Sequence, residues 1–220
     1  MKIIVKILVI IILIANIPNK CIAQDSVDRK AFISLNSGVF LPSASNFKKV
    51  YNSPCTFING ISIGIPITNE DFFFYIKAMY FQKNGTPITY HFERDSITGE
   101  FYTYTTQEGN VVYKQWLGNI GIQYNLNFGQ TNNFIFNGGV TLIKLSERIK
   151  NSTAGDNAKG LNGLFFGIGY EKIILEKFSL FSEVQYNFDM RKFQILGYDI
   201  HLKYGGANFN VGMRYYFSQK

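Results

Sequence analysis

The end of the chain alternates between large apolar residues and small or polar ones. Over residues 208–217 the apolar set is Phe209, Val211, Met213, Tyr215 and Phe217, and the polar set includes Asn208, Asn210, Gly212 and Arg214. A period of two is that of a β-strand, because successive side chains of a strand point to opposite faces. The pattern therefore predicts a strand with one apolar and one polar face.

Seven earlier segments show the same alternation, and no part of the chain has a convincing helical period. Their approximate bounds are residues 31–41, 57–67, 72–83, 111–128, 134–147, 161–172 and 178–189. Each is long enough to cross a hydrocarbon layer as a tilted strand, which takes about 10 residues. With the terminal strand the count is even, as in single-chain outer-membrane barrels. We therefore predict an all-β fold, an eight-stranded antiparallel up-and-down transmembrane β-barrel.

The connections between these segments alternate in length. Residues 67–71, 129–133 and 173–177 are short, whereas residues 42–56, 84–110, 148–160 and 190–206 are long and polar. Short periplasmic turns opposite long extracellular loops are typical of membrane barrels. Residues 87–108 alternate around a turn at 96–99, which predicts a β-ribbon that extends two of the strands above the membrane.

The alternative is a soluble eight-stranded barrel such as a lipocalin, whose apolar face points inward. The polar faces here are rich in Gly, Asn, Gln and Ser, and only 17% of residues are charged, fewer than a soluble surface usually carries. We therefore expect Phe209, Val211, Met213, Tyr215 and Phe217 to face lipid, and Asn210, Gly212 and Arg214 to line the lumen beside the first and seventh strands. An interfacial aromatic girdle is predicted from Tyr75, Tyr80, Tyr113, Trp116, Tyr170 and Tyr215.

The N-terminus reads as a secretory signal peptide. Lys2 and Lys6 precede an apolar run over residues 7–14, and Cys21-Ile22-Ala23 places small residues at −3 and −1 of a cleavage site. We predict cleavage after Ala23, rather than lipid attachment at Cys21, because polar residues precede that cysteine. Residues 1–23 are then the signal peptide, and residues 24–220 form the barrel domain with a short lead at 24–29. The expected location is the cell outer membrane.

Charge and cysteine content exclude several other classes of protein. The net charge of +7 includes three lysines of the signal peptide, and the remaining charges are scattered, so no nucleic-acid partner is expected. They suit a solvated surface with some affinity for anionic lipid head groups. Cys55 is the only cysteine after residue 23, which excludes an internal disulfide or a thiolate metal cluster.

Several segments resemble a known family of small barrels. Residues 74–85 (FYIKAMYFQKNG) are similar to the third strand of the porin-like or PorT-like outer-membrane β-barrel family common in Bacteroidetes, with Asn84 inserted before the final Gly. Residues 167–171 with 184–186 resemble its sixth and seventh strands, and residues 212–217 resemble its closing strand. The usual Pro of the fourth strand is missing here. The resemblance implies the barrel architecture and, for PorT itself, a link to a gliding-associated secretion system.

Residues that could carry chemistry are few. His91 and His201 fall in predicted extracellular loops, and His91 has Glu93, Asp95 and Ser96 nearby. A Ser-His site needs hydrogen-bond reach and an orienting carboxylate, and a solvated loop explains these residues better. Gly167-Ile168-Gly169 is an incomplete dinucleotide-binding signature without a following helix. We therefore interpret these glycines as small residues that take up little space on the lumen face. We predict no catalytic, cofactor-binding or metal-binding residue, and no cofactor.

Four charged residues fall on the predicted lumen faces: Lys77, Glu171, Glu183 and Arg214. An eight-stranded barrel is just wide enough for its side chains to fill it, and isolated buried charges are costly. We therefore predict that Glu183 pairs with Arg214 or Lys77 and plugs the lumen, Glu183 and Arg214 being expected nearly level on adjacent strands. The alternative is that each charge meets lumen water.

These features predict a non-enzymatic outer-membrane protein with a structural, surface-interaction or PorT-like secretion-accessory role. An open porin is disfavoured because aqueous channels take roughly 16–18 strands. The alternatives are a lipid-modifying barrel enzyme that uses His91 or His201, and an adhesin that binds through its loops. Expected partners are outer-membrane lipid and lipopolysaccharide, the barrel-assembly machinery and secretion-system components, and the expected oligomeric state is a monomer.

Overall fold

A computed structural model describes most of the chain after its N-terminal region. The described residues are 31–43, 47–67, 71–86, 88–94, 100–107, 109–128, 131–149, 157–188, 190–195, 198–203 and 205–217. The predicted signal peptide and the lead at 24–29 therefore lie outside the described residues.

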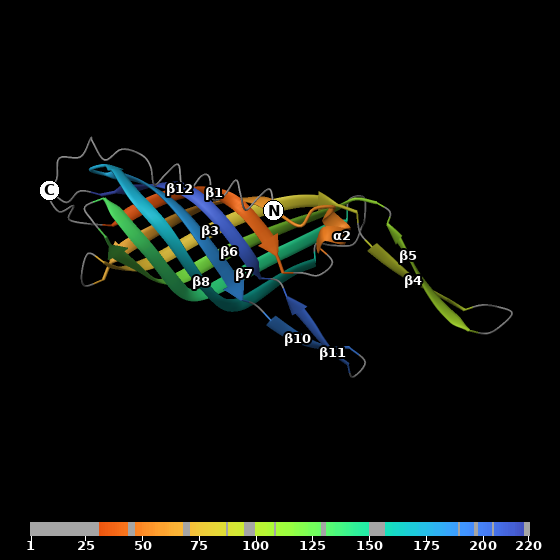
Figure 1. Cartoon of the computed structure of the whole chain (residues 1–220). Helices are drawn as coiled ribbons and strands as arrows, with labels where there is room; N and C mark the ends of the chain where they lie inside the picture. The colour runs from red at the N-terminus through yellow and green to blue at the C-terminus, as the bar shows by residue number, and fades with distance from the viewer. Residues whose placement is uncertain are drawn as a thin grey trace.

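Eight strands form one closed antiparallel barrel (Figure 1). They are β1 (Phe32–Pro42), β2 (Thr56–Pro66), β3 (Phe72–Gly85), β6 (Val111–Asn127), β7 (Asn132–Ile149), β8 (Asn157–Leu175), β9 (Phe178–Phe188) and β12 (Gly206–Tyr216). Around the barrel the order is β1-β12-β9-β8-β7-β6-β3-β2. Barrel strands that are consecutive along the chain are therefore also neighbours in the sheet. This up-and-down order confirms the predicted fold class.

The C-terminal strand closes the barrel against the first strand. Residues of β12 pair with β1 from Phe32↔Tyr216 to Pro42↔Gly206, and with β9 on the other side. Because no strand of the barrel is left with an unpaired edge, every strand has its backbone partners inside the sheet. A membrane-spanning sheet needs this closure, since the hydrocarbon layer offers no water to hydrogen-bond a free edge.

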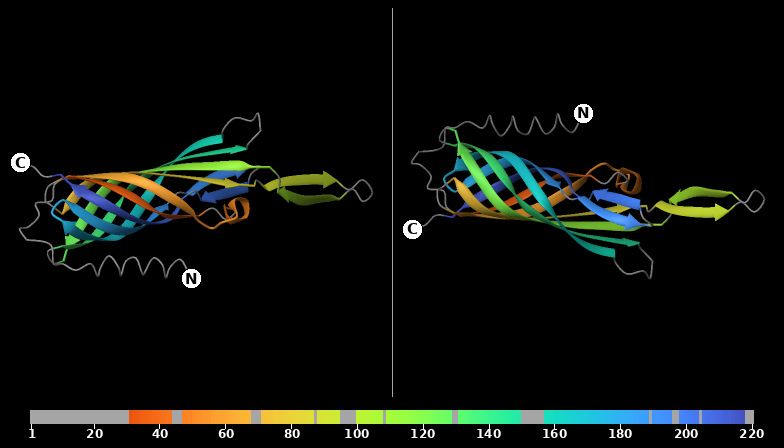
Figure 2. Two further views of the ribbon diagram at one scale, coloured as in Figure 1. Left: turned by 90° about the horizontal axis from the view of Figure 1, so that it is seen from above. Right: turned by 90° about the horizontal axis from the view of Figure 1, so that it is seen from below.

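Two β-ribbons leave the barrel at the same end (Figures 1 and 2). The first consists of β4 (Ile88–Arg94) and β5 (Phe101–Gln107), which confirms the predicted extension between the third and fourth barrel strands. The second consists of β10 (Met190–Ile195) and β11 (Tyr198–Lys203). We expected residues 190–206 to form a polar loop, so that prediction was wrong. We call this end of the barrel the loop side and the opposite end the turn side.

Two other long connections also contain more structure than expected. In the loop predicted at 148–160, residues 148–149 belong to the end of β7 and residues 157–160 to the start of β8, and the two strands still pair at Glu147↔Asn157. The connection at 42–56 contains a short helix, α2 (Phe47–Tyr51). Among the described residues, no helix is long and apolar enough to cross a membrane.

Large apolar side chains cover the outside of the barrel. The exposed fraction is 52% for Ile122, 56% for Phe166 and 48% for Val184, whereas the alternating positions point inward and are buried. Amides, hydroxyls and charges fill many of those inward positions, which is the reverse of a lipocalin-type barrel. The apolar exterior and polar interior are those of a transmembrane barrel.

The terminal strand follows this alternation with one departure. Met213 and Phe217 are about half exposed on the outside, while Asn210 and Arg214 are buried on the inside, as predicted. Phe209 is only 8% exposed although it lies in the outward row. Its expected contact with lipid is therefore not seen.

Aromatic side chains gather in pairs near both ends of the outer surface. The rings of Tyr80 and Trp116 are in tilted contact at the loop side, and Tyr215 lies between Phe178 and Phe217 at the turn side. We predicted that Tyr75 and Tyr113 belong to this girdle, but that was wrong, because both point into the barrel. Tyr75 lies between the outward-facing Phe74 and Ile76, and Tyr113 is next to the outward-facing Lys114. Because side chains alternate along a strand, both tyrosines face the lumen.

Candidate functional site

The lumen is the most distinctive site of the molecule because ion pairs are buried inside it. Lys77 on β3 reaches across the barrel to Glu183 on β9, and both side chains are almost inaccessible to solvent. Lys77 Nζ also donates to Gln185 Oε1 at 3.2 Å, and Asn137 Nδ2 donates to Glu183 Oε2 at 2.7 Å. This confirms the predicted interaction between Glu183 and Lys77.

A second buried ion pair joins Arg214 on β12 to Glu171 on β8. Arg214 Nη1 lies 3.2 Å from Glu171 Oε2, and the guanidinium carbon lies 3.8 Å from the centre of the Phe32 ring. The carboxylate also accepts hydrogen bonds from Ser179, Tyr216 and Asn133. Glu171 therefore has four donors around it, which is what a fully buried carboxylate requires.

The alternative pairing of Glu183 with Arg214 is wrong. In the register between β9 and β12, Glu183 pairs with Asn210 and Arg214 pairs with Ser179. The two charges are therefore about four residues apart along the strands rather than nearly level. The alternation in the sequence correctly placed both charges on the lumen face. The strand register, however, brings Arg214 next to Glu171 and not next to Glu183.

Glycines on the inner face make room for these side chains. A Cβ atom at Gly167 would lie 2.3 Å from Asn137 Oδ1, the side chain that donates to Glu183. A Cβ at Gly64 would lie 2.1 Å from the ring of Phe32, which packs against Arg214. The structure thus agrees with our interpretation that small residues keep the lumen face slim.

Two apolar clusters lie on either side of the polar layer. The turn-side cluster consists of Phe32, Phe73, Tyr75, Phe165 and Tyr216. The loop-side cluster consists of Phe40, Phe47, Tyr51, Ile58, Met79, Phe81, Val111, Leu117, Ile143 and Leu145. Between them the inward side chains are buried, so the described interior is a packed core and not an open channel.

The helix α2 contributes directly to the loop-side cluster. Phe47 and Tyr51 pack on each other and both contact the ring of Tyr113. The backbone N–H of Thr86 donates to the carbonyl of Val50 at 2.8 Å, which ties the helix to the end of β3. A short loop segment thus closes the barrel with aromatic side chains, a feature that sequence periodicity could not show for so short a helix.

Some amides of the polar layer have no hydrogen-bond partner among the residues that the structure describes. Asn36 and Asn119 leave both amide atoms unpaired, and Thr141 Oγ1 and Arg214 Nε also lack a partner. Buried polar atoms of this kind are normally hydrogen-bonded to water. We therefore expect water molecules to occupy the lumen beside these residues.

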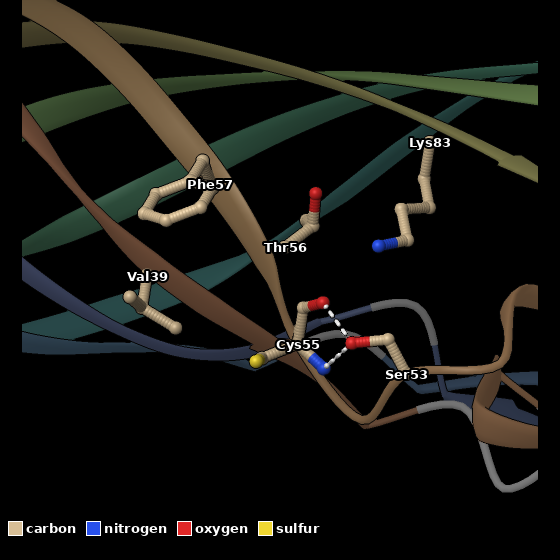
Figure 3. Close-up of a pocket in the computed structure, with 6 residues that line it drawn as sticks. All are labelled: Val39, Ser53, Cys55, Thr56, Phe57 and Lys83. Carbon is tan, nitrogen blue, oxygen red and sulfur yellow. Dashed lines mark hydrogen bonds between the residues drawn. The ribbon is translucent and has the colours of Figure 1, made fainter. Parts of the chain in front are cut away.

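A pocket of about 160 Å³ lies at the loop-side rim (Figure 3). Its lining residues are Val39, Ser53, Cys55, Thr56, Phe57 and Lys83. Val39 and Phe57 border one side and Lys83 the other, while the Ser53 hydroxyl donates to the Cys55 carbonyl at 2.7 Å. The described lining includes a hydroxyl, a thiol and the amine of Lys83, but no histidine or carboxylate.

The histidines considered as catalytic candidates are not assembled into a site by the described residues. His91 Nε2 lies 2.8 Å from Thr106 Oγ1, across the β4–β5 ribbon. Asp95 and Ser96 lie outside the described residues, as does the side chain of His201. Within the described part of the chain, His, Cys, Asp and Glu residues form no group of three or more that could hold a metal ion.

An apolar exterior, a packed polar interior and complete closure define a small transmembrane β-barrel. The sequence matches no protein-family model and no curated protein. Among solved structures, it is similar to outer membrane protein OprG from Pseudomonas aeruginosa, with 12% identity, a TM-score of 0.60 and coverage of 89% of this chain and 100% of OprG. It is also similar to Neisserial surface protein A, with 13% identity, a TM-score of 0.56 and coverage of 85% and 97%. At these identities the similarity concerns the fold.

Proposed function

We propose that this protein is a non-enzymatic outer-membrane β-barrel that acts through its loop side. The observation that carries the proposal is the contrast between a packed lumen and two ribbons that project from one end. A barrel filled in this way offers no solute path, whereas the ribbons present backbone and side chains beyond the membrane. The function is therefore a structural and surface-interaction role. The names of OprG and Neisserial surface protein A support an outer-membrane and surface location.

A secretion-accessory role is the more specific form of this proposal. It is supported by the resemblance of residues 74–85, 167–171 and 212–217 to strands of the PorT-like family. In that role the loop side would contact other components of the cell envelope. The adhesin alternative uses the same surface, so a single deletion tests both.

The orientation of the barrel predicts which cysteines a membrane-impermeant maleimide can label. In a Cys55→Ser background, Asn110→Cys on the loop side should be labelled in intact cells. Glu176→Cys in the β8–β9 turn should be labelled only after the outer membrane is disrupted, because that turn faces the periplasm. Cys55→Ser alone is the control and should remain unlabelled once the signal peptide is removed. Labelling of Glu176→Cys, but not of Asn110→Cys, in intact cells would reverse the orientation.

Deleting residues 88–107 should abolish the surface role and leave the barrel folded. Gly85 still pairs with Val111, and Thr86, Pro87, Glu108, Gly109 and Asn110 remain to connect β3 to β6 as a short hairpin loop. Cells that carry the deletion should lose secreted protein from the medium, or lose adhesion to a matrix-coated surface, while the variant keeps its heat-modifiable gel shift. The two readouts distinguish a secretion accessory from an adhesin.

Two results would contradict the proposed function. One is normal secretion and normal adhesion by the deletion variant, which would leave the β4–β5 ribbon without a role. The other is a steady conductance of the purified protein in a planar lipid bilayer, because a packed lumen should pass no continuous current.

A further inference from the structure

The pocket at the loop-side rim lies where β2 and β3 stop pairing. The last pair between these strands is Asn59↔Tyr80. β2 nevertheless begins earlier, at Thr56, and β3 continues to Gly85. Continuing the same register would place Thr56 directly opposite Lys83. The two strands separate instead, and both residues line the space between their ends. We call this space the β2–β3 pocket.

The connection that contains α2 fixes one wall of the β2–β3 pocket. The N–H of Thr86 donates to the carbonyl of Val50 at 2.8 Å, which holds α2 beside the end of β3. Asn52 then turns the chain with a φ of 52°, the left-handed conformation that commonly ends a helix. The Ser53 hydroxyl donates to the Cys55 carbonyl at 2.7 Å and accepts from the Cys55 N–H at 3.4 Å. The pocket is therefore formed by the protein alone, as small-molecule sites usually are.

Two hydrogen-bond donors face the β2–β3 pocket from opposite strands. Thr56 is only 7% exposed, and the amine of Lys83 extends toward it from the other wall (Figure 3). Lys83 forms no ion pair with any residue that the structure describes, and neither side chain hydrogen-bonds to a described residue. A buried hydroxyl normally has a partner. An ammonium and a hydroxyl that can both donate are complementary to the two oxygens of an anion.

The apolar side of the pocket determines which class of anion fits. Val39 and Phe57 border this side, and Phe57 is 78% exposed. A phosphate or sulfate would leave both side chains uncovered, whereas a carboxylate with a short alkyl chain would remove their apolar surface from water. The volume of about 160 Å³ is close to that of a cavity of about 150 Å³ that holds benzene, so about six non-hydrogen atoms fit. Butyrate has this size.

The pocket opens beyond the membrane interface. Tyr80 contacts Trp116 in the aromatic girdle of the loop side. Lys83 lies three residues further along β3, which is about 10 Å along a strand. A small acid dissolved outside the membrane can therefore reach the pocket without crossing the packed lumen.

We propose that the β2–β3 pocket binds a short-chain carboxylate. Lys83 Nζ donates a charge-assisted hydrogen bond to one carboxylate oxygen, and the Thr56 hydroxyl donates to the other. The alkyl chain lies against Val39 and Phe57. This inference goes beyond the proposed surface role and shares with it only the outward position of the loop side.

Amide NMR of the purified, ¹⁵N-labelled protein in detergent micelles, titrated with sodium butyrate, tests this proposal. The signals of Cys55, Thr56 and Phe57 should shift and saturate, with a Kd of about 1–10 mM for so small a ligand. Sodium chloride at the same concentration should not shift them, and neither should butyramide, which has the same shape without the charge.

Variants of the two donors show which groups hold the carboxylate. K83Q should bind butyrate about 10-fold more weakly or worse, because it removes a charge-assisted hydrogen bond. T56V, which removes a neutral donor at nearly constant volume, should bind about 5-fold more weakly. K83R should retain binding. K114Q, which removes an exposed lysine from the neighbouring strand β6, is the matched control and should bind as the wild type does.

Three results would each overturn the proposal: shifts that do not saturate, equal shifts with butyramide, and unchanged affinity of K83Q. Amide signals from the rest of the barrel show in the same spectra whether a variant has kept its fold. Because the titration uses purified protein, its outcome is separate from that of the ribbon deletion in cells. Loss of secretion or adhesion on deletion, without butyrate binding to the wild type, would reject the pocket alone. Butyrate binding without any effect of the deletion would reject the surface role alone.

Discussion

Replacing Glu171 by leucine should destabilise the barrel by about 3–5 kcal/mol, the usual cost of removing one partner from a buried ion pair. The substitution leaves the buried guanidinium of Arg214 without its counter-ion. It also removes the acceptor for the Ser179, Tyr216 and Asn133 donors. The free energy of unfolding can be measured by urea titration in micelles, followed by the fluorescence of Trp116, the only tryptophan.

Two matched variants show whether the charge or the position causes this loss. Glu171→Gln keeps an oxygen acceptor and most of the volume, so it should lose less stability than Glu171→Leu. Glu176→Gln, in the exposed turn, should leave the unfolding curve unchanged. A Glu171→Leu barrel as stable as the wild type would show that the Arg214 network does not hold the closing strand in place.

Lys77→Met should also cost about 3–5 kcal/mol, because it leaves the Glu183 carboxylate buried without a cation. The double variant Lys77→Met/Glu183→Leu removes both charges and replaces them with apolar side chains of similar volume. Such replacements of whole buried pairs are often neutral or stabilising. The double variant should therefore recover most of the stability lost in Lys77→Met, as measured by the same urea titration.

A double-mutant cycle separates this pair from its surroundings. Lys77→Met, Glu183→Leu and the double variant should give an interaction free energy of about 1–3 kcal/mol. If the two single losses simply add, Lys77 and Glu183 do not stabilise each other. The exposed pair of positions Gln82 and Lys114, adjacent in the register of β3 and β6, provides a control with no expected coupling.

The strands and their faces could be predicted because they depend on local patterns. Phe209 to Phe217 and the seven earlier segments carry the period of two in their own residues, and neighbours in sequence became neighbours in the barrel. The β4–β5 ribbon was found in the same way. The β10–β11 ribbon was missed although Phe193, Ile195, Ile200 and Leu202 alternate with polar residues, because each run is short.

The lumen contacts could be predicted only in part. Lys77 and Glu183 were correctly expected to meet, but Arg214 was given the wrong alternative partner. Tyr75 and Tyr113 were assigned to the outer girdle from residue type, although their strand positions place them inside.

The sequence by itself determined the number of barrel strands, the alternation of short and long connections, and the direction in which most side chains point. These follow from a period of two that every strand carries locally. Only the tertiary structure decided which charges pair across the lumen and that α2 packs into the loop-side cluster. The physical reason is that cross-barrel contacts depend on the register of every intervening strand, and a shift of one residue in any of them would change the partners.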